Sequence, residues 1–213
     1  MELLARIRTI LDSKDQDVEI ARFLADIRES LAASNKQFVT YKVLVAASLV
    51  TYYLVVYSQG NFSFNSVQIT DRSLFQRVFL LVPAALLCAQ AAIGYLRRIQ
   101  RETYDFLQIA RCRMFGATGL HELRLPADFI LGLFVLRNEG GTVGRAIASI
   151  AALLSFIAFM IGPAVYVVYE ALRNISVFGV DDFLSLIISG MAVALCVSAV
   201  GIVVLSGRVK VSQ

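Results

Sequence analysis

A run of 24 residues without a charge, from Ala146 to Tyr169, constrains this chain more than any other feature. The run lies between Arg145 and Glu170 and is apolar on every face. At about 1.5 Å per residue it makes a helix of about 36 Å, enough to cross a hydrocarbon core of about 30 Å with some tilt. A soluble core helix of this length would normally carry a polar stripe. The run therefore predicts a transmembrane helix.

Three further stretches follow the same logic, and hydrophobic residues make up 58% of the 213 residues. That share exceeds what a soluble domain carries, so the excess apolar surface is expected to face lipid. We expect an all-α integral membrane protein with four transmembrane helices, about 39–57, 74–96, 146–169 and 183–206. Pro83 predicts a bend in the second helix, and Gly162-Pro163 a kink in the third.

The positions of Lys and Arg predict how the chain is threaded. Sixteen of the 20 lie in residues 1–38, residues 97–145 and the C-terminal tail, whereas the loops that follow the first and third spans hold one each. Cytoplasmic loops carry the excess of positive charge. We therefore expect both termini to be cytoplasmic, in what we take to be a bacterial inner membrane. The chain would then divide into cytosolic amphipathic helices (1–38), a first transmembrane hairpin (39–96), a cytosolic helical segment (97–145), a second hairpin of like orientation (146–206) and a cytosolic tail (207–213).

The N-terminal segment has one apolar side. Leu24, Ile27 and Leu31 recur at helical spacing, with Asp26 and Glu29 on the other side. We interpret this as a cytosolic helix that packs within the protein, with docking of a partner as the alternative. The conformation of residues 120–141 stays open.

Catalytic chemistry has no sequence signature here. The four predicted spans contain no Asp, Glu or His and no deeply placed Lys, which argues against ion-coupled transport and intramembrane hydrolysis. His121 is the only histidine and lacks neighbouring ligands at metal-site spacing. We expect no catalytic residues, no cofactor and no metal. A pore between subunits remains open, because hydroxyl groups or apolar constrictions can line a channel.

Small residues form stripes on the third and fourth spans. Small side chains allow close approach of helices where lipid offers no hydrophobic incentive. These residues predict either contact between the two spans or contact between subunits: Ala151, Ser155, Ala158, Gly162, Gly190, Ala194 and Ser198. Gln90, a strongly polar residue well inside the second span, would bridge helices by a hydrogen bond or, alternatively, line a pore.

Basic residues are densest just after the second span, at Arg97, Arg98, Arg101, Arg111 and Arg113. Attraction to anionic lipid headgroups explains such a cluster. An acidic cytosolic protein is the alternative ligand, and direct contact with nucleic acid is not expected.

In outline this architecture resembles small four-span membrane subunits of bacterial multi-component systems, including some phage-defence systems, which work with a cytosolic partner; the resemblance rests on architecture and on no motif. Together these features favour a non-enzymatic, homo-oligomeric membrane subunit whose cytosolic face docks or responds to a soluble protein, in a defence or signalling setting. The alternatives are an oligomeric ion channel or membrane-permeabilising effector gated by its cytosolic helices, and a carrier or enzyme for lipid-like substrates.

Overall fold

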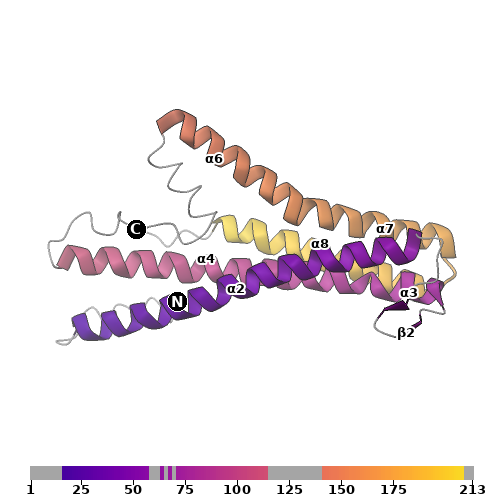
Figure 1. Ribbon diagram of the computed structural model, residues 1–213, viewed down its shortest axis with the longest axis horizontal. Coiled ribbons are helices and arrows are strands. Elements are labelled where there is room, and N and C mark those ends of the chain that lie inside the picture. The colour runs from indigo at the N-terminus through magenta and orange to yellow at the C-terminus, as the bar shows by residue number, and fades with distance from the viewer. Residues whose placement is uncertain (1–15, 58–62, 65–66, 69–70, 115–140, 209–213) are drawn as a thin grey trace. The chain divides into compact units, whose positions relative to one another are not determined.

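The computed structural model describes residues 16–57, 63–64, 67–68, 71–114 and 141–208 (Figure 1). The first 15 residues of the predicted cytosolic amphipathic helices and the open segment 120–141 lie outside these ranges, apart from Gly141. In chain order the elements are α2 (Gln16–Tyr57), β1 (Ser63–Phe64), β2 (Val67–Gln68), α3 (Arg72–Phe79), α4 (Leu81–Met114), α6 (Gly141–Phe156), the π-helix η1 (Ile157–Ile161), α7 (Gly162–Phe178) and α8 (Phe183–Arg208).

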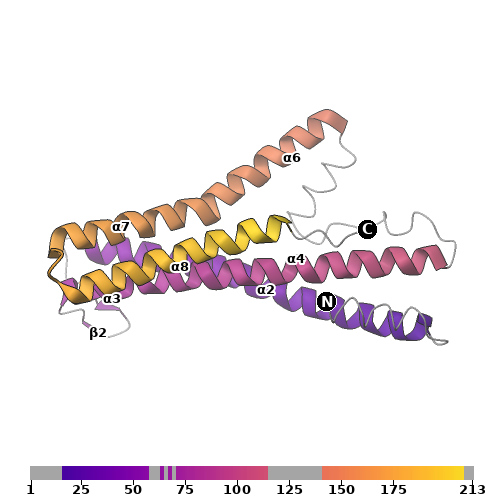
Figure 2. The ribbon, with the colours of Figure 1, turned by 180° about the vertical axis from the view of Figure 1, so that it is seen from behind.

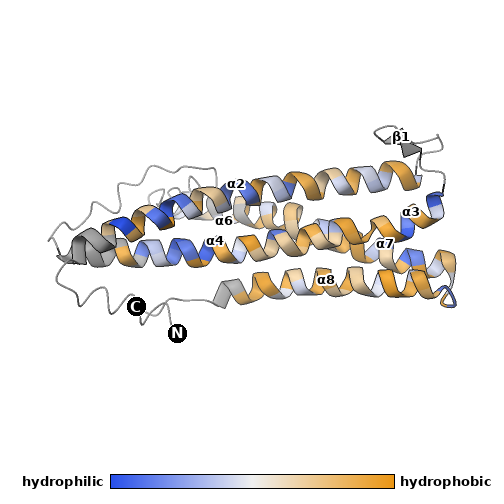
Figure 3. Cartoon of the chain, turned by 90° about the horizontal axis from the view of Figure 1, so that it is seen from below, coloured by the Kyte–Doolittle hydropathy of each residue, from blue (hydrophilic) through white to orange (hydrophobic). Residues whose placement is uncertain are grey.

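Four helical stretches are long and apolar enough to cross a membrane, which confirms the predicted number. They comprise Ala21–Tyr57, Arg72–Asp105, Thr142–Phe178 and Phe183–Leu205. Figure 3 shows α8 to be apolar along nearly its whole length, whereas polar residues gather in the N-terminal part of α2 and the C-terminal part of α4. The predicted cytosolic helix and first span form one continuous helix, α2.

The chain divides into two compact units, of which the first comprises residues 1–36, 96–125 and 209–213. Its core is the contact between Leu24 of α2 and Leu107 of α4, which are both buried. Phe23, Ile27 and Tyr104 pack around this pair. The apolar side of the N-terminal segment thus packs within the protein, at least at Leu24 and Ile27.

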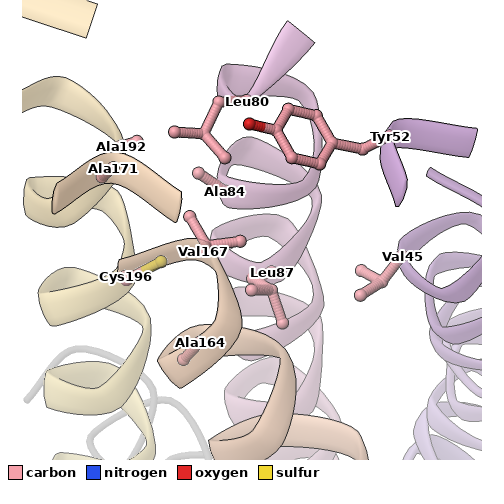
Figure 4. Close-up of a cluster of buried hydrophobic side chains, with 10 residues drawn as sticks. All are labelled: Val45, Tyr52, Leu80, Ala84, Leu87, Ala164, Val167, Ala171, Ala192 and Cys196. Atoms are coloured by element: carbon pink, nitrogen blue, oxygen red, sulfur yellow. The ribbon is translucent and has the colours of Figure 1, made fainter. Parts of the chain in front are cut away.

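The second unit comprises residues 37–95 and 126–208. Helices α7 and α8 lie side by side in it, as Figures 1 and 2 both show. Its main core joins side chains from α2, α4, α7, α8 and the junction between α3 and α4 (Figure 4), namely Val45, Tyr52, Leu80, Ala84, Leu87, Ala164, Val167, Ala171, Ala192 and Cys196. Four of these ten are alanines, so the helix backbones can approach closely.

The second span begins with a broken helix. Asp71 caps α3 by accepting a hydrogen bond from the N–H of Leu74 at 3.0 Å. Helix α3 ends at Phe79 and α4 begins at Leu81. Pro83 has no N–H to donate to the carbonyl of Phe79, so the break lies one turn before the proline, where a bend was predicted. Upstream, β1 and β2 pair as a small antiparallel hairpin, with Ser63 opposite Gln68.

The third span differs from the predicted one at its C-terminal end. We expected a loop from Glu170 to Asp182, but α7 continues to Phe178. Gly179 then stops the helix with a φ of 86°, a left-handed conformation that favours glycine, and its N–H donates to the carbonyl of Ile175. Only residues 179–182 separate α7 from α8. Glu170 and Arg173 therefore lie inside a helix, not in a loop.

Candidate functional site: a buried polar network

Glu170 is the centre of a polar network in the second unit. Its side chain is fully buried. The hydroxyl of Tyr57 donates to Oε1 at 2.5 Å, and the hydroxyl of Tyr52 donates to Oε2 at 3.3 Å. Nη1 of Arg173 lies 3.3 Å from the same Oε2. A buried carboxylate is tolerated when it is paired and hydrogen-bonded, and here both oxygens accept at least one bond.

Helical spacing brings the polar residues of α7 together. Glu170, Arg173 and Asn174 stand three and four residues apart, which places them on one face of the helix. Tyr57 meets this face from α2 and is held in two ways. The Arg173 guanidinium stacks over its ring, 4.5 Å from the centroid, and also donates to its hydroxyl. The C-terminal end of α2 is thereby attached to α7.

A second pair of polar side chains joins α3 to α7. Nε2 of Gln76 donates to Oδ1 of Asn174 at 2.8 Å, and Nδ2 of Asn174 donates to the backbone oxygen of Gln76 at 3.3 Å. Asn174 is fully buried. It opens an N-glycosylation sequon, Asn174-Ile175-Ser176, but a buried asparagine inside a helix is a poor acceptor for a glycan.

A third contact joins α3 to the start of α8. Nη1 of Arg77 lies 2.8 Å from Oδ2 of Asp182, and the Ser185 hydroxyl donates to the same oxygen at 2.6 Å. The Arg77 guanidinium also stacks over the ring of Phe178, 4.3 Å from its centroid. The ionic partner of Arg77 is thus Asp182, 105 residues away in the sequence.

These three contacts link α2, α3, α7 and α8 by polar side chains. The predicted spans themselves contain no acidic residue, but the third helix continues past its predicted end at Tyr169, so Glu170 is part of that helix. Glu170 lies in the C-terminal part of the apolar helical stretch Thr142–Phe178, with its cationic partner Arg173 one turn away. Ionisable residues within membrane spans are expensive and generally functional, so this network is the candidate functional site. Chemically it can hold helix ends together, and it can shelter a charge from lipid.

The sequence contained a signal for this site that we did not use. Val167, Glu170, Ala171 and Asn174 continue the three-and-four spacing of the apolar run, and all four are buried. A helix that extended through Asn174 would have placed Glu170 on the inward face. Tyrosines near the end of a span are typical of an interfacial aromatic belt, a role that does not predict the buried hydrogen bond of Tyr52 to Glu170.

The predicted small-residue stripe lies mostly outside the contacts of the second unit. Ala151 and Ser155 are half-buried, and the remaining five residues are exposed: Ala158, Gly162, Gly190, Ala194 and Ser198. Helix α8 instead turns a different set of small residues inward, namely Ser185, Ser189, Ala192, Cys196 and Ala199. The stripe is therefore not the surface through which α7 and α8 meet.

Gln90 is buried, and its Nε2 donates to the backbone oxygen of Phe159 at 3.3 Å. It thus bridges α4 and η1, as one of its two predicted roles requires. The basic residues Arg97, Arg98 and Arg101 lie on α4 and are half-buried, and Nε of Arg98 pairs with Oε1 of Glu102 at 2.8 Å. Arg111 and Arg113 lie near the end of α4.

Within residues that the structure describes, no three His, Cys, Asp or Glu side chains gather as a metal site would require. His121 lies outside those residues.

Comparison of the chain with models of known protein families, with curated proteins and with solved structures finds no match.

Proposed function

We propose that this protein is a non-enzymatic membrane subunit that crosses the bilayer four times and associates with copies of itself. The observation that carries this proposal is the second small-residue face of α8. Gly190, Ala194 and Ser198 are exposed, although α8 already packs against α7 through another small-residue face. A Cβ built on Gly190 would meet no atom within 4 Å. A helix from a second copy could therefore approach this face closely.

The test replaces the stripe without disturbing the fold. Gly190→Leu and Ala194→Leu add bulk where the chain itself leaves space. We expect the full chain, labelled for energy transfer and reconstituted in liposomes, to self-associate at least tenfold less in the double variant. Val200→Leu is the matched control, because it adds bulk at another exposed face of α8 and should leave association unchanged. A wild-type protein that stays monomeric across lipid dilutions contradicts the proposal.

The threading of the chain belongs to the same proposal. The distribution of Lys and Arg supports two hairpins of like orientation with both termini in the cytosol. A cysteine introduced at Asn65, between β1 and β2, should react with an impermeant maleimide added outside intact cells. Labelling only after the cells are opened would show that the chain is threaded in the opposite orientation.

The proposed cytosolic partner contacts the basic cluster Arg97, Arg98, Arg101, Arg111 and Arg113. If it does, reversing these charges should abolish co-purification of that partner in mild detergent. Charge reversal at Arg72, on the other side of the proposed membrane, is the control. Co-purification that survives reversal of all five arginines contradicts docking at this surface. Loss of vesicle binding alone would assign the cluster to anionic lipid.

An oligomeric channel is the second candidate function. The specific observation in its favour is Glu170, a buried acidic residue in a candidate span, because ionisable residues at membrane depth often mark ion pathways. Ion flux into liposomes that contain only the purified protein would support this candidate. If the protein is oligomeric but passes no ions, a scaffold is the function that remains.

A further inference from the structure

The third membrane-spanning helix contains an irregular turn. Between α6 and α7, the N–H of Gly162 donates to the carbonyl of Ile157, five residues earlier, so Ile157–Ile161 form a π-helix. Pro163 follows directly and has no N–H to offer the carbonyl of Phe159, which lies one α-helical turn before it. Short π segments inside α-helices are frequent at functional positions, and sharp bends concentrate at proline and at π segments.

Another helix supplies the donor that Pro163 lacks. Nε2 of Gln90, from α4, donates to the backbone oxygen of Phe159 at 3.3 Å and lies 3.8 Å from Sδ of Met160. Gln90 is only 2% exposed. An amide side chain buried among apolar residues is costly unless it is hydrogen-bonded. Its position therefore indicates a specific contact with the irregular turn.

The ring of the same phenylalanine is held from a third helix. Nζ of Lys42, from α2, lies 4.9 Å from the ring centroid of Phe159 and 4.7 Å from that of Phe38. A cation over an aromatic face is attracted by the ring quadrupole. Phe159 is thus contacted through its backbone by α4 and through its side chain by α2.

The two sides of the turn differ in their support. On the α7 side, Glu170 and Asn174 anchor the helix to α2 and α3, and α7 packs along α8. On the α6 side, the large apolar side chains that the structure describes are exposed, among them Val143, Ile147, Ile150, Leu153 and Leu154. A change in the turn would therefore move α6 and leave α7 in place.

We propose that Ile157–Pro163 is a hinge with two backbone registers, and that Gln90 locks it in the π register. In the locked state Gln90 holds the Phe159 carbonyl. Release of this bond lets the segment return to α-helical register, which rotates α6 by about 100° and shifts it by about 1.5 Å per residue of register change. The hinge requires neither self-association nor a particular orientation of the chain in the membrane.

The test measures the bend directly. Spin labels at Ile150 on α6 and Leu172 on α7, in a full-length background with Cys88→Ala, Cys112→Ser and Cys196→Ala, report the distance across the hinge in liposomes. We expect one narrow peak in this background and a second peak in Gln90→Leu, which lacks the donor. Pro163→Ala restores an N–H and should lengthen the distance toward the rise of about 33 Å for 22 residues of straight helix.

Two controls separate hinge release from general loosening. Gln76→Leu removes a different interhelical amide bond, to Asn174, and should leave the Ile150–Leu172 peak unchanged. A second label pair, Leu172 with Leu186 on α8, should give the same distance in every variant. The proposed lock is overturned if Gln90→Leu keeps the single original peak, and the proposed hinge is overturned if Pro163→Ala keeps that peak. The proposal is equally overturned if Gln76→Leu produces the same second peak, or if the Leu172–Leu186 distance changes with Gln90→Leu.

Discussion

The hydroxyl of Tyr57 lies 2.5 Å from Oε1 of Glu170, although 113 residues separate them in the chain. Tyr57 is the last residue of α2, and Glu170 is buried on α7. This contact attaches the first span to the third, and together with Tyr52 and Arg173 it satisfies a carboxylate that is buried in an apolar environment. The stability of the second unit should therefore depend on Glu170 more than on its apolar neighbours of similar size.

Replacing Glu170 by alanine should destabilise the protein by about 3 kcal/mol, because Arg173 and two tyrosine hydroxyls lose their common acceptor. Denaturant titration in detergent micelles measures the free energy of unfolding. Glu170→Gln is the matched control: its amide oxygen still accepts one tyrosine bond, so the loss should be about 1 kcal/mol. Equal losses in the free energy of unfolding for the two variants would contradict a stabilising role for the oxygen atom that Glu170→Gln keeps as an acceptor.

The Arg77–Asp182 pair should show energetic coupling. Both side chains are mostly buried, with 20% and 23% exposure, and Asp182 also accepts from Ser185. A double-mutant cycle with Arg77→Ala and Asp182→Ala should give a coupling energy of about 1 kcal/mol. Arg98 and Glu102 form a more exposed pair on α4 and provide the comparison, for which we expect less than about 0.5 kcal/mol. Additive effects at Arg77 and Asp182 would contradict the pairing.

The start of α3 should weaken in acid. The hydrogen bonds from the Leu74 N–H and the Ser73 hydroxyl lower the pKa of Asp71 below its ordinary value of 3.8. A lowered pKa means that the cap contributes stability above the ordinary pKa and loses it as the pH falls through the folded-state value. Amide hydrogen exchange at Leu74, corrected for intrinsic rates, should therefore accelerate below about pH 4. Asp71→Asn keeps an acceptor without a titrating group and should show no such acceleration.

The first unit should depend on Leu107. This side chain is 2% exposed and packs on Leu24. Leu107→Ala removes buried methyl groups and leaves a cavity, which should destabilise the first unit by about 3 kcal/mol. Amide exchange should accelerate in residues 21–36 of α2. Leu96→Ala, at a position 47% exposed on the same helix, is the control. The same acceleration of exchange in residues 21–36 in this control variant would contradict a specific Leu24–Leu107 contact.

Local patterns predicted several features correctly. The fourth span, expected at about 183–206, forms α8 from Phe183 to Arg208. Pro83 predicted a distortion of the second helix, and the break between α3 and α4 lies one turn before it. Both predictions depend on residues near one another in the chain. The end of the third helix was predicted wrongly because we placed it just before the first charged residue, Glu170, whereas α7 continues to Phe178.

The sequence by itself determined that this chain contains four helices able to span a membrane, because apolar length and the absence of charge are local properties. It also determined where proline would interrupt them, because the missing N–H acts within one turn. Only the tertiary structure decided that Glu170 meets Tyr57, that Arg77 pairs with Asp182 and that Gln90 donates to the Phe159 carbonyl. The physical reason is desolvation: a buried polar group is tolerated only if a partner meets it, and these partners come from helices 69 to 113 residues away.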